Sequence, residues 1–182
     1  EAIWIITSDH GEEFGERGSW GRAHTLYSEQ LDIPLIFSGP KIPNGTVKGS
    51  VGLQDLAPTL LQLIDKKTGP KGDGISLLPA MKGKTLPERE MIAETSRFES
   101  NRLSLQKDNH RLEWDLKSDK IELFDIKADP KEALDISKKQ MDRAKTLRDQ
   151  LITAVDQKTW TASSAGQVRI SKGRLIDRGL HE

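Results

Sequence analysis

The chain has 182 residues with 28 basic and 28 acidic side chains, a balance that gives no electrostatic footprint for nucleic acid or an anionic membrane. It has no Cys, which excludes disulfide bonds, thiolate metal sites and Cys nucleophiles within these residues. No apolar run approaches the ~20 residues that span a bilayer. The chain opens with Glu1 beside an apolar run, and we therefore expect it to be a piece of a longer protein.

The first third of the sequence predicts buried strands separated by loops. Residues 3–6 form a short, continuous apolar run before a polar turn, a pattern typical of a buried, parallel strand. Residues 34–38 predict a second buried strand. Between them, residues 12–21 are Gly-rich and charged and predict a loop, whereas residues 26–31 predict a short helix or turn.

A helix is predicted to begin at Asp55, a residue type that suits an N-cap. Its apolar side chains recur at helical spacing and predict one buried face, made of Leu56, Leu60, Leu63 and Ile64. Pro58 falls in the first turn, where its missing N–H costs nothing. Residues 89–94 predict one more strand.

The second half predicts a small antiparallel unit. Residues 102–106, 110–114 and 121–124 alternate apolar and polar side chains and are separated by turns, which indicates a meander with one solvated face. An amphipathic helix is predicted over residues 138–156, and the sequence from residue 158 onward is weakly patterned and predicts a loosely attached tail. The predicted buried stripe of the helix is Met141, Ala144, Leu147, Leu151 and Val155.

These patterns predict an α/β core over residues 1–95, an antiparallel subdomain with a C-terminal helix over residues 96–157, and a tail over residues 158–182. Polar residues that follow a buried strand in an α/β core commonly contribute to a site.

The polar turn after the first strand contains the clearest candidate site. Asp9 and His10 are adjacent, and Gly11 permits a bend that turns both toward one point. A carboxylate and an imidazole are ordinary ligands of a divalent cation, although such an ion needs at least one or two more. The same spacing also suits a plain turn or cap.

A second set of polar residues follows in the next loop. His24, Arg17 and Arg22 could hold the oxygens of a sulfate or phosphate group near a metal, or they could be solvated loop residues. Glu12 and Glu13 could form an acid–base pair, although adjacent loop carboxylates are usually solvated.

Five segments in chain order then resemble one known family. The strand end at residues 5–12 is similar to the metal-binding strand end of sulfatases, in the alkaline phosphatase superfamily. The other similar segments are the His-Thr-Leu-Tyr-Ser-Glu run at residues 24–29 with the strand at 33–36, the Asp-Leu-Ala-Pro-Thr-Leu helix at 55–60, residues 72–79, and the Glu-Leu-Phe-Asp-Ile and Asp-Pro-Lys-Glu runs between 122 and 132.

The resemblance implies a fold and a site. The fold is the C-terminal part of an alkaline-phosphatase-like sandwich, a mostly parallel sheet with helices, followed by a small antiparallel α+β subdomain. Asp9 and His10 would be two ligands of a divalent cation, Ca²⁺ first and Mn²⁺ or Zn²⁺ as alternatives. His24 would contact the anion or protonate the leaving alkoxide, and Arg22 would help to neutralise the anion.

The implied activity is hydrolysis of a sulfate ester by a longer, metal-dependent enzyme. Phosphoryl transfer within the same superfamily, by a phosphodiester or phosphonate hydrolase or a lipid head-group transferase, is the alternative; a non-catalytic module that kept the fold is the third. The resemblance also implies action in the periplasm, outside the cell or on a membrane-anchored extracytoplasmic domain, with any membrane segment upstream.

Two departures from the family pattern bear on these expectations. The nucleophile motif and the first metal carboxylates of sulfatases do not occur in these residues, so the partner of this chain would be an N-terminal part of the same polypeptide. We therefore expect the isolated chain to be inactive. Arg17 stands where many sulfatases have His in a Gly-Glu-His-Gly run.

Overall fold

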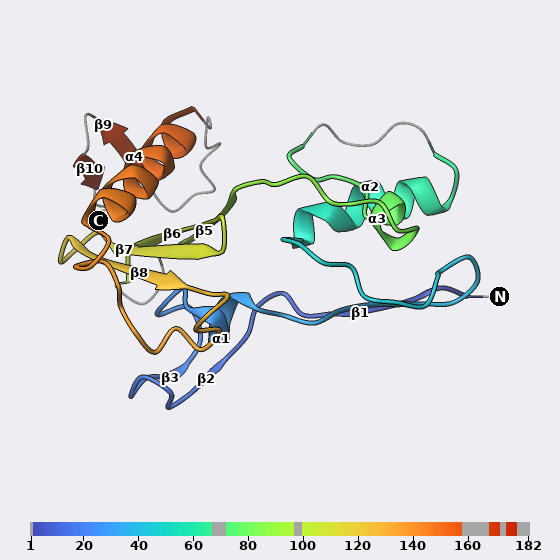
Figure 1. Cartoon of the computed structure of the whole chain (residues 1–182), viewed down its shortest axis with the longest axis horizontal. Helices are drawn as coiled ribbons and strands as arrows, with labels where there is room; N and C mark the ends of the chain where they lie inside the picture. Colours follow the sequence, from blue (N-terminus) through green and yellow to red (C-terminus); the bar gives the residue numbers. More distant parts are fainter. Residues whose placement is uncertain (1, 67–71, 97–99, 158–167, 172–173, 178–182) are drawn as a thin grey trace, which may run out of the picture.

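The computed structural model describes residues 2–66, 72–96, 100–157, 168–171 and 174–177, which form two lobes (Figure 1). One lobe contains β1, β4 and the helices α2 and α3; the other contains a four-stranded sheet and the long helix α4. The fold is of the α/β class, with mixed helices and sheets. No helix in the described ranges is long and apolar enough to cross a membrane.

The first lobe is built around a pair of strands, β1 (Trp4–Thr7) and β4 (Leu35–Ser38). They are antiparallel, with Trp4 opposite Ser38 and Thr7 opposite Leu35. The parallel direction predicted for the first strand is wrong for this pair. A continuous apolar run indicates that both faces of a strand suit burial, but it carries no information on the direction of its neighbour.

The helical part of this lobe begins with a 3₁₀ turn at Leu53–Asp55, continues as α2 (Leu56–Leu63), and is followed by the short α3 (Leu78–Met81). Asp55 precedes α2 as predicted, but its side chain makes no hydrogen bond to the first turn of the helix. Its carboxylate instead accepts the backbone N–H of Gly52 and of Ile75, both at 2.9 Å, and pairs with Arg89.

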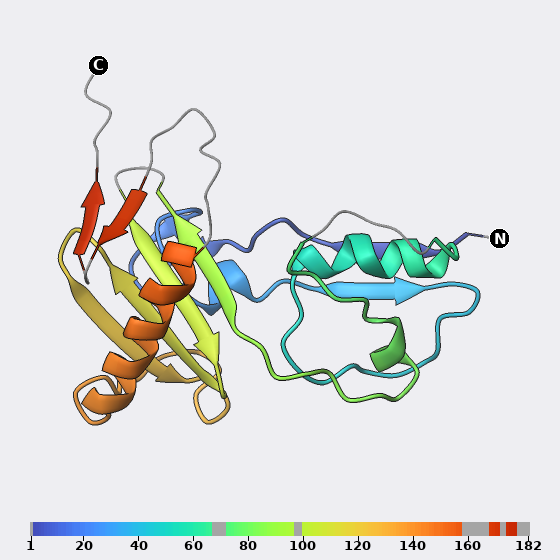
Figure 2. The same ribbon diagram turned by 90° about the horizontal axis from the view of Figure 1, so that it is seen from above.

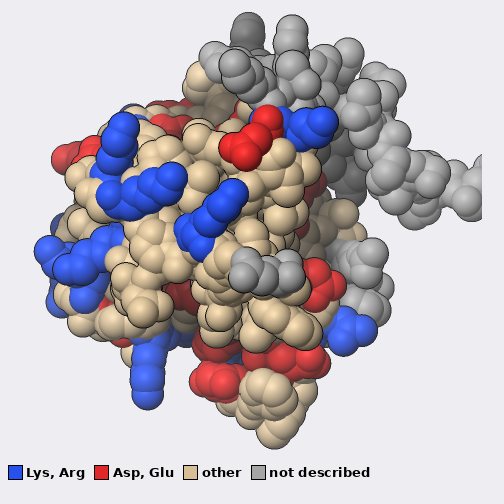
Figure 3. All heavy atoms as spheres, turned by 90° about the vertical axis from the view of Figure 1, so that its right-hand side faces the viewer, with Lys and Arg blue, Asp and Glu red and all other residues tan. Residues whose placement is uncertain are grey.

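Several large apolar side chains of the first lobe are exposed among the described residues. The predicted buried face of α2 is therefore wrong at two positions, because Leu60 and Ile64 are 42% and 62% exposed. The residues of this helical segment that are fully buried are Asp55 and Thr59. Figure 3 shows this end of the molecule as largely tan surface, with Lys and Arg over its left and upper parts and Asp and Glu below. Three more apolar side chains of the first lobe, all on β1 and β4, are exposed: Trp4, Ile6 and Ile36.

The second lobe confirms the predicted meander. Its strands are β5 (Met91–Thr95), β6 (Arg102–Lys107), β7 (His110–Asp115) and β8 (Lys120–Asp125), antiparallel and adjacent in chain order. Helix α4 (Met141–Gln157) lies across one face of this sheet (Figure 2). The apolar core between them contains Leu103, Leu105, Leu112, Trp114 and Leu123 of the sheet and Ala144, Leu147, Leu151 and Val155 of the helix. Met141, predicted as part of the stripe, is 71% exposed at the first turn.

The opposite face of the sheet is covered by the N-terminal segment. This segment contains the hairpin of β2 (Glu13–Phe14) and β3 (Trp20–Gly21), in a region predicted as loop, and the short helix α1 (Ser28–Leu31). The prediction of a solvated face is wrong, because Ser104, Arg111 and Glu113 on that face are buried. Alternation along a strand separates a polar from an apolar face, but it does not determine whether the polar face meets water or another segment.

Strand β5 lies before residue 96 in the sequence and is hydrogen-bonded to β6 after it. The predicted division of the chain at residue 95 stays a prediction. In the predicted tail, β9 (Val168–Ser171) and β10 (Arg174–Asp177) form an antiparallel pair. The other residues of the tail lie outside the described ranges.

Candidate functional site

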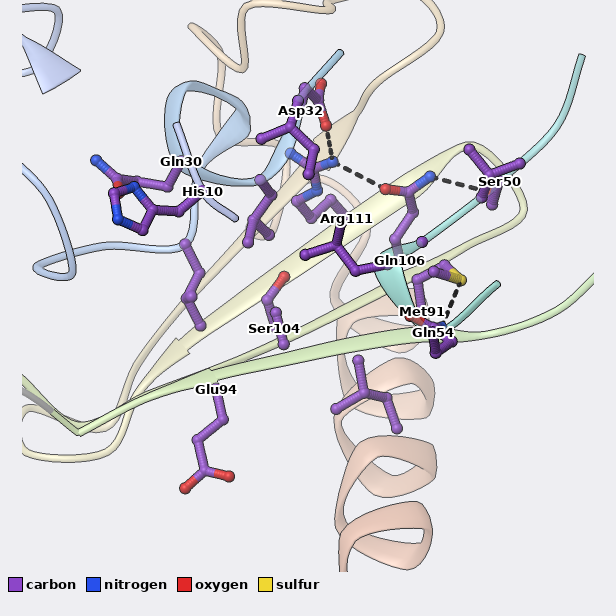
Figure 4. Close-up of a pocket in the computed structure, with 18 of the residues that line it drawn as sticks. His10, Gln30, Asp32, Ser50, Gln54, Met91, Glu94, Ser104, Gln106 and Arg111 are labelled. Carbon is purple, nitrogen blue, oxygen red and sulfur yellow. Dashed lines mark hydrogen bonds and ion pairs between the residues drawn. The ribbon is translucent and has the colours of Figure 1, made fainter. Parts of the chain in front are cut away.

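A cleft of about 590 Å³ lies where the two lobes meet. Its walls come from the end of β1 and the turn that follows it, the segment around α1, residues 49–54, and the polar face of β5 to β7 (Figure 4). Asp9 and His10 line this cleft, as do Ala23 and Thr25 on either side of His24. His24 itself is not among the lining residues, so the structure brings its segment, but not its side chain, to the cleft.

The turn at Asp9 and His10 places a carboxylate next to an imidazole. The Nδ1 atom of His10 lies 2.7 Å from the carbonyl oxygen of Gly11. A carbonyl oxygen only accepts, so Nδ1 carries a proton in this bond. Nε2 lies 3.6 Å from Oδ2 of Asp9, while Oδ1 of Asp9 accepts the backbone N–H of His10 at 3.0 Å. A ligating His commonly donates its other nitrogen to a carbonyl in this way.

The charge state of Asp9 suits a ligand as well. A hydrogen bond from its own backbone N–H and the neighbouring His10 ring hold the pKa of Asp9 below its ordinary value. The carboxylate is therefore ionised over the neutral range. One carboxylate oxygen and one imidazole nitrogen fit a divalent cation as two of its ligands. Within the described ranges no group of three or more His, Cys, Asp or Glu residues could hold a metal.

Gly11 fixes this turn against helix α1. Its backbone N–H donates to the carbonyl oxygen of Gln30 at 2.8 Å. A Cβ atom at position 11 would overlap the carbonyl oxygen of Glu29, so the close approach of the two backbones requires Gly. The glycine therefore permits contact with a neighbouring segment rather than an unusual backbone angle.

Gln30 connects the Asp9–His10 turn to the loop that carries His24. The residue is buried, and its side-chain oxygen accepts the N–H of Ala23 at 3.3 Å while its side-chain nitrogen donates to the carbonyl of Gly21 at 2.9 Å. Figure 4 shows His10 and Gln30 next to each other. Ala23 has a φ of 66°, a left-handed conformation that is strained for a residue with a Cβ.

Side chains from the second lobe hold the rest of the His24 segment, residues 23–28. Two hydroxyls of the second lobe donate to the segment: Thr95 Oγ1 to the carbonyl of Ala23 at 2.9 Å and Ser100 Oγ to the carbonyl of His24 at 2.7 Å. The segment in turn donates to three carboxylates of that lobe: Leu26 N to Glu113 Oε1 at 3.2 Å, Tyr27 Oη to Glu122 Oε2 at 2.6 Å, and Ser28 N to Glu132 Oε2 at 2.8 Å.

The electrostatics beneath this segment are dominated by buried carboxyl groups. Burial raises the pKa of Glu113 to about 7, although Arg102 at 2.9 Å and the N–H of Leu26 act in the opposite direction. Glu13 is also buried and bonds the hydroxyl of Thr25. The expectation of a solvated carboxylate is thus wrong for Glu13, because the β2–β3 hairpin folds it under the His24 segment.

The two arginines of the predicted anion contact behave differently from each other. The Arg22 side chain is 60% exposed and lies 4.0 Å from Glu12, and it is not part of the cleft lining. Arg17 is held by the fold: it lies 3.2 Å from Glu29, donates to two backbone carbonyls at residues 131 and 132, and stacks 3.9 Å above the Tyr27 ring. Arg17 therefore packs and supports α1.

Sequence reasoning missed Gln30, Thr95, Ser100 and the Arg111 network. Arg111 reaches the cleft from β7 and donates to Asp32 at 2.7 Å and to the Gln106 side chain at 2.8 Å (Figure 4). Only Arg111 carried a usable signal, as a cation on an alternating strand two residues before the carboxylate of Glu113. The others are ordinary polar residues whose partners are distant in the chain.

The chain is similar to sulfatases by sequence and structure. The family model described as Sulfatase matches residues 1–66. The Low-salt glycan biosynthesis sulfotransferase Agl7 of Haloferax volcanii is 40% identical over 82 residues, which cover 42% of this chain and 20% of that protein. The choline-sulfatase of Rhizobium meliloti is 26% identical over 140 residues, or 75% of this chain and 27% of that protein.

A solved structure extends the similarity beyond residue 66. The candidate sulfatase yidJ of Bacteroides fragilis superposes with a TM-score of 0.69 at 25% identity, covering 84% of this chain and 35% of that one. Residues 1–66 thus match the Sulfatase family model, and most of the described chain shares the fold of a sulfatase. The chain spans about a fifth to a quarter of the length of the two curated relatives named above.

Proposed function

We propose that this chain is part of a longer, metal-dependent sulfatase-like hydrolase that cleaves sulfate esters. The observation that carries the proposal is the Asp9–His10 turn at the cleft, where Nε2 of His10 lies 3.6 Å from Oδ2 of Asp9 and Nδ1 is bonded to the carbonyl of Gly11. Similarity to sulfatases supports the same reading over this segment. Ca²⁺ is the proposed ion, with Mn²⁺ or Zn²⁺ as alternatives.

Each proposed residue has a separate task. Asp9 and His10 hold two positions of the cation, which when bound supplies a Lewis acid for the ester oxygens. His24 contacts the transferred group or protonates the leaving alkoxide, from a segment fixed by the second lobe. Arg22 adds positive charge beside the anion; its 60% exposed side chain and its distance of 4.0 Å from Glu12 leave it able to turn toward a ligand.

We further propose that sequence preceding Glu1 in the complete protein covers the exposed apolar side chains of the first lobe and supplies the nucleophile and the remaining metal ligands. Trp4, Ile6 and Ile36 lie on β1 and β4 and are all more than half exposed. Apolar side chains gathered on adjacent strands are stabilised when another segment covers them. Residues 1–182 alone are accordingly expected to be inactive, and the complete protein is proposed to work outside the cytoplasm.

The test is metal binding and hydrolysis by the complete protein. Ca²⁺ titrated by calorimetry should bind the unchanged protein and bind Asp9→Ala or His10→Ala at least tenfold more weakly. The control is Asp149→Ala, which removes an exposed carboxylate on α4 and should leave binding unchanged. Unchanged binding in both site variants would refute the ligand assignment.

Activity then separates the candidate reactions. With Ca²⁺ present, 4-nitrophenyl sulfate should be hydrolysed faster than 4-nitrophenyl phosphate, and each ligand variant should abolish that hydrolysis. A preference for the phosphate ester would identify a phosphoryl-transfer member of the superfamily instead. Absence of both metal binding and hydrolysis would identify a non-catalytic module that kept the fold.

A further inference from the structure

Two hydroxyl side chains at the end of β5 and before β6 donate to the backbone of the segment that carries His24. Thr95 ends β5 and is buried, and its hydroxyl donates to the carbonyl of Ala23 at 2.9 Å. Ser100 lies before β6, and its hydroxyl donates to the carbonyl of His24 at 2.7 Å. Both bonds join residues more than 70 positions apart in sequence. Two consecutive carbonyls are thus held by hydroxyls from the end of β5 and from the connection between β5 and β6.

The backbone at this point is not in a relaxed conformation. Ala23, directly before His24, has a φ of 66°, which a non-Gly residue adopts only when its surroundings hold it there. The N–H of Ala23 is bonded by Gln30 and its carbonyl by Thr95, so bonds on both sides maintain the strain. Strained backbone retained next to a proposed reacting group commonly serves to aim that group.

We propose that Thr95 and Ser100 are positioning residues, which act through the backbone of Ala23 and His24 to set the place of the His24 imidazole. The proposal rests on the role of His24 in the proposed function. An imidazole displaced by about 1 Å from its working position can lower a rate by as much as ~100-fold. The second lobe therefore contributes to the reaction through the backbone carbonyls of Ala23 and His24.

The experiment uses the complete protein with Ca²⁺ and 4-nitrophenyl sulfate. Ser100→Ala and Thr95→Val are each expected to lower kcat roughly 5- to 20-fold and to change KM less than about twofold. The conservative variants Ser100→Thr and Thr95→Ser retain a hydroxyl and should restore most of kcat. Thr153→Ala removes a hydroxyl that bonds a carbonyl at 2.9 Å on the exposed side of α4, and it should leave kcat unchanged.

A double-mutant cycle distinguishes positioning from general stability. His24→Ala should lower kcat roughly 100-fold or more, and adding Ser100→Ala to it should change kcat less than about twofold. Equal losses from Ser100→Ala with and without His24 would overturn the proposal. Full activity of His24→Ala would refute the role of His24 and the positioning together. A large loss in His24→Ala with normal activity in both hydroxyl variants would refute the positioning alone.

An NMR measurement gives a second readout that does not depend on activity. In protein labelled at the histidine ring carbons, Ser100→Ala and Thr95→Val should each move the His24 resonance. The resonance of His110, which is bonded to the carbonyl of Asp108 on the far turn of the sheet, should stay in place and serves as the internal control. A His24 resonance unmoved in both variants would overturn the proposal.

Discussion

Replacing Asp55 by Asn is expected to lower the free energy of unfolding by about 3–5 kcal/mol, because it removes the charged partner of a buried ion pair. Asp55 is fully buried, and its partner Arg89 is only 14% exposed. The pair joins the start of α2 to the segment just before β5. Asp55 also accepts the N–H of Gly52, a residue that lines the cleft.

The magnitude follows from how the two carboxylate oxygens are used. Oδ1 accepts Ile75 N–H and one nitrogen of Arg89, while Oδ2 accepts Gly52 N–H and the other. An Asn side chain has only one acceptor oxygen, so in either orientation its amide nitrogen faces one backbone donor and one guanidinium donor. A buried unsatisfied N–H costs about 1–3 kcal/mol, and loss of a bond to a charged group costs about 1.5–3 kcal/mol.

The assay is urea unfolding of the complete protein at pH 7, followed by tryptophan fluorescence. Asp149→Asn is the matched control, because Asp149 is an exposed carboxylate 3.5 Å from Arg148 and should contribute less than about 1 kcal/mol. A loss below about 1 kcal/mol in Asp55→Asn, equal to that of the control, would refute the reasoning.

The same pair predicts a pH dependence of definite sign. Burial alone would raise the pKa of Asp55, but the bonds from Arg89, Gly52 and Ile75 outweigh it and lower the pKa below its ordinary value of 3.8. The unfolded chain thus takes up the proton at a higher pH than the folded one. The stabilisation is complete above pH 3.8 and is lost as the pH falls below it.

Three further changes test the interior of the second lobe. Glu113→Gln should be more stable than the unchanged protein at pH 8 but not at pH 4.5. The folded pKa of Glu113, about 7, lies above its ordinary value of 4.5. The ionised carboxyl therefore lowers the free energy of unfolding as the pH rises from 4.5 to 7, by about 3 kcal/mol in all. Leu151→Ala should cost about 2–5 kcal/mol in urea unfolding because Leu151 is fully buried, whereas Met141→Ala on the exposed first turn of the same helix should cost less than about 0.5 kcal/mol. Arg17→Lys should lower the midpoint of unfolding, since Lys cannot stack flat on Tyr27 while donating to two carbonyls, and calorimetric Ca²⁺ affinity should stay unchanged.

The second lobe was largely predictable from sequence because its signals are local. Each strand of the meander alternates apolar and polar side chains, and each turn has residues that tolerate positive φ, as Asp108, Asn109 and Asp119 do at 49°, 60° and 57°. The apolar stripe of α4 follows from helical spacing over most of its length. The prediction of burial is wrong at Met141, because helical spacing alone extends the apolar stripe past the edge of the sheet that the helix packs against.

The first lobe was less predictable because its burial depends on what lies next to it. The pattern on α2 correctly marks an apolar face, yet Leu60 and Ile64 are exposed among the described residues. An amphipathic pattern shows which face of a helix is apolar, but it does not show whether another segment covers that face. Similarly, the apolar runs located β1 and β4, but the parallel direction predicted for the first strand is wrong for this pair, because an apolar run does not determine the direction of a neighbouring strand.

The candidate site depends on contacts that no sequence spacing contains. The run containing Tyr27 and the run containing Glu122 were each identified in the sequence, and the fold joins them through a 2.6 Å bond across 95 positions. Glu132, in the Asp-Pro-Lys-Glu run, bonds the N–H of Ser28 across 104 positions. These two carboxylates support the segment on which His24 lies, as the buried Glu113 does from β7 through Leu26. On a solvated face these polar residues of the meander would contribute little to the structure. Here they are necessary for the geometry of the cleft. Substitutions in the second lobe should therefore alter the proposed chemistry of the first lobe and the cleft, even where they leave the sheet folded.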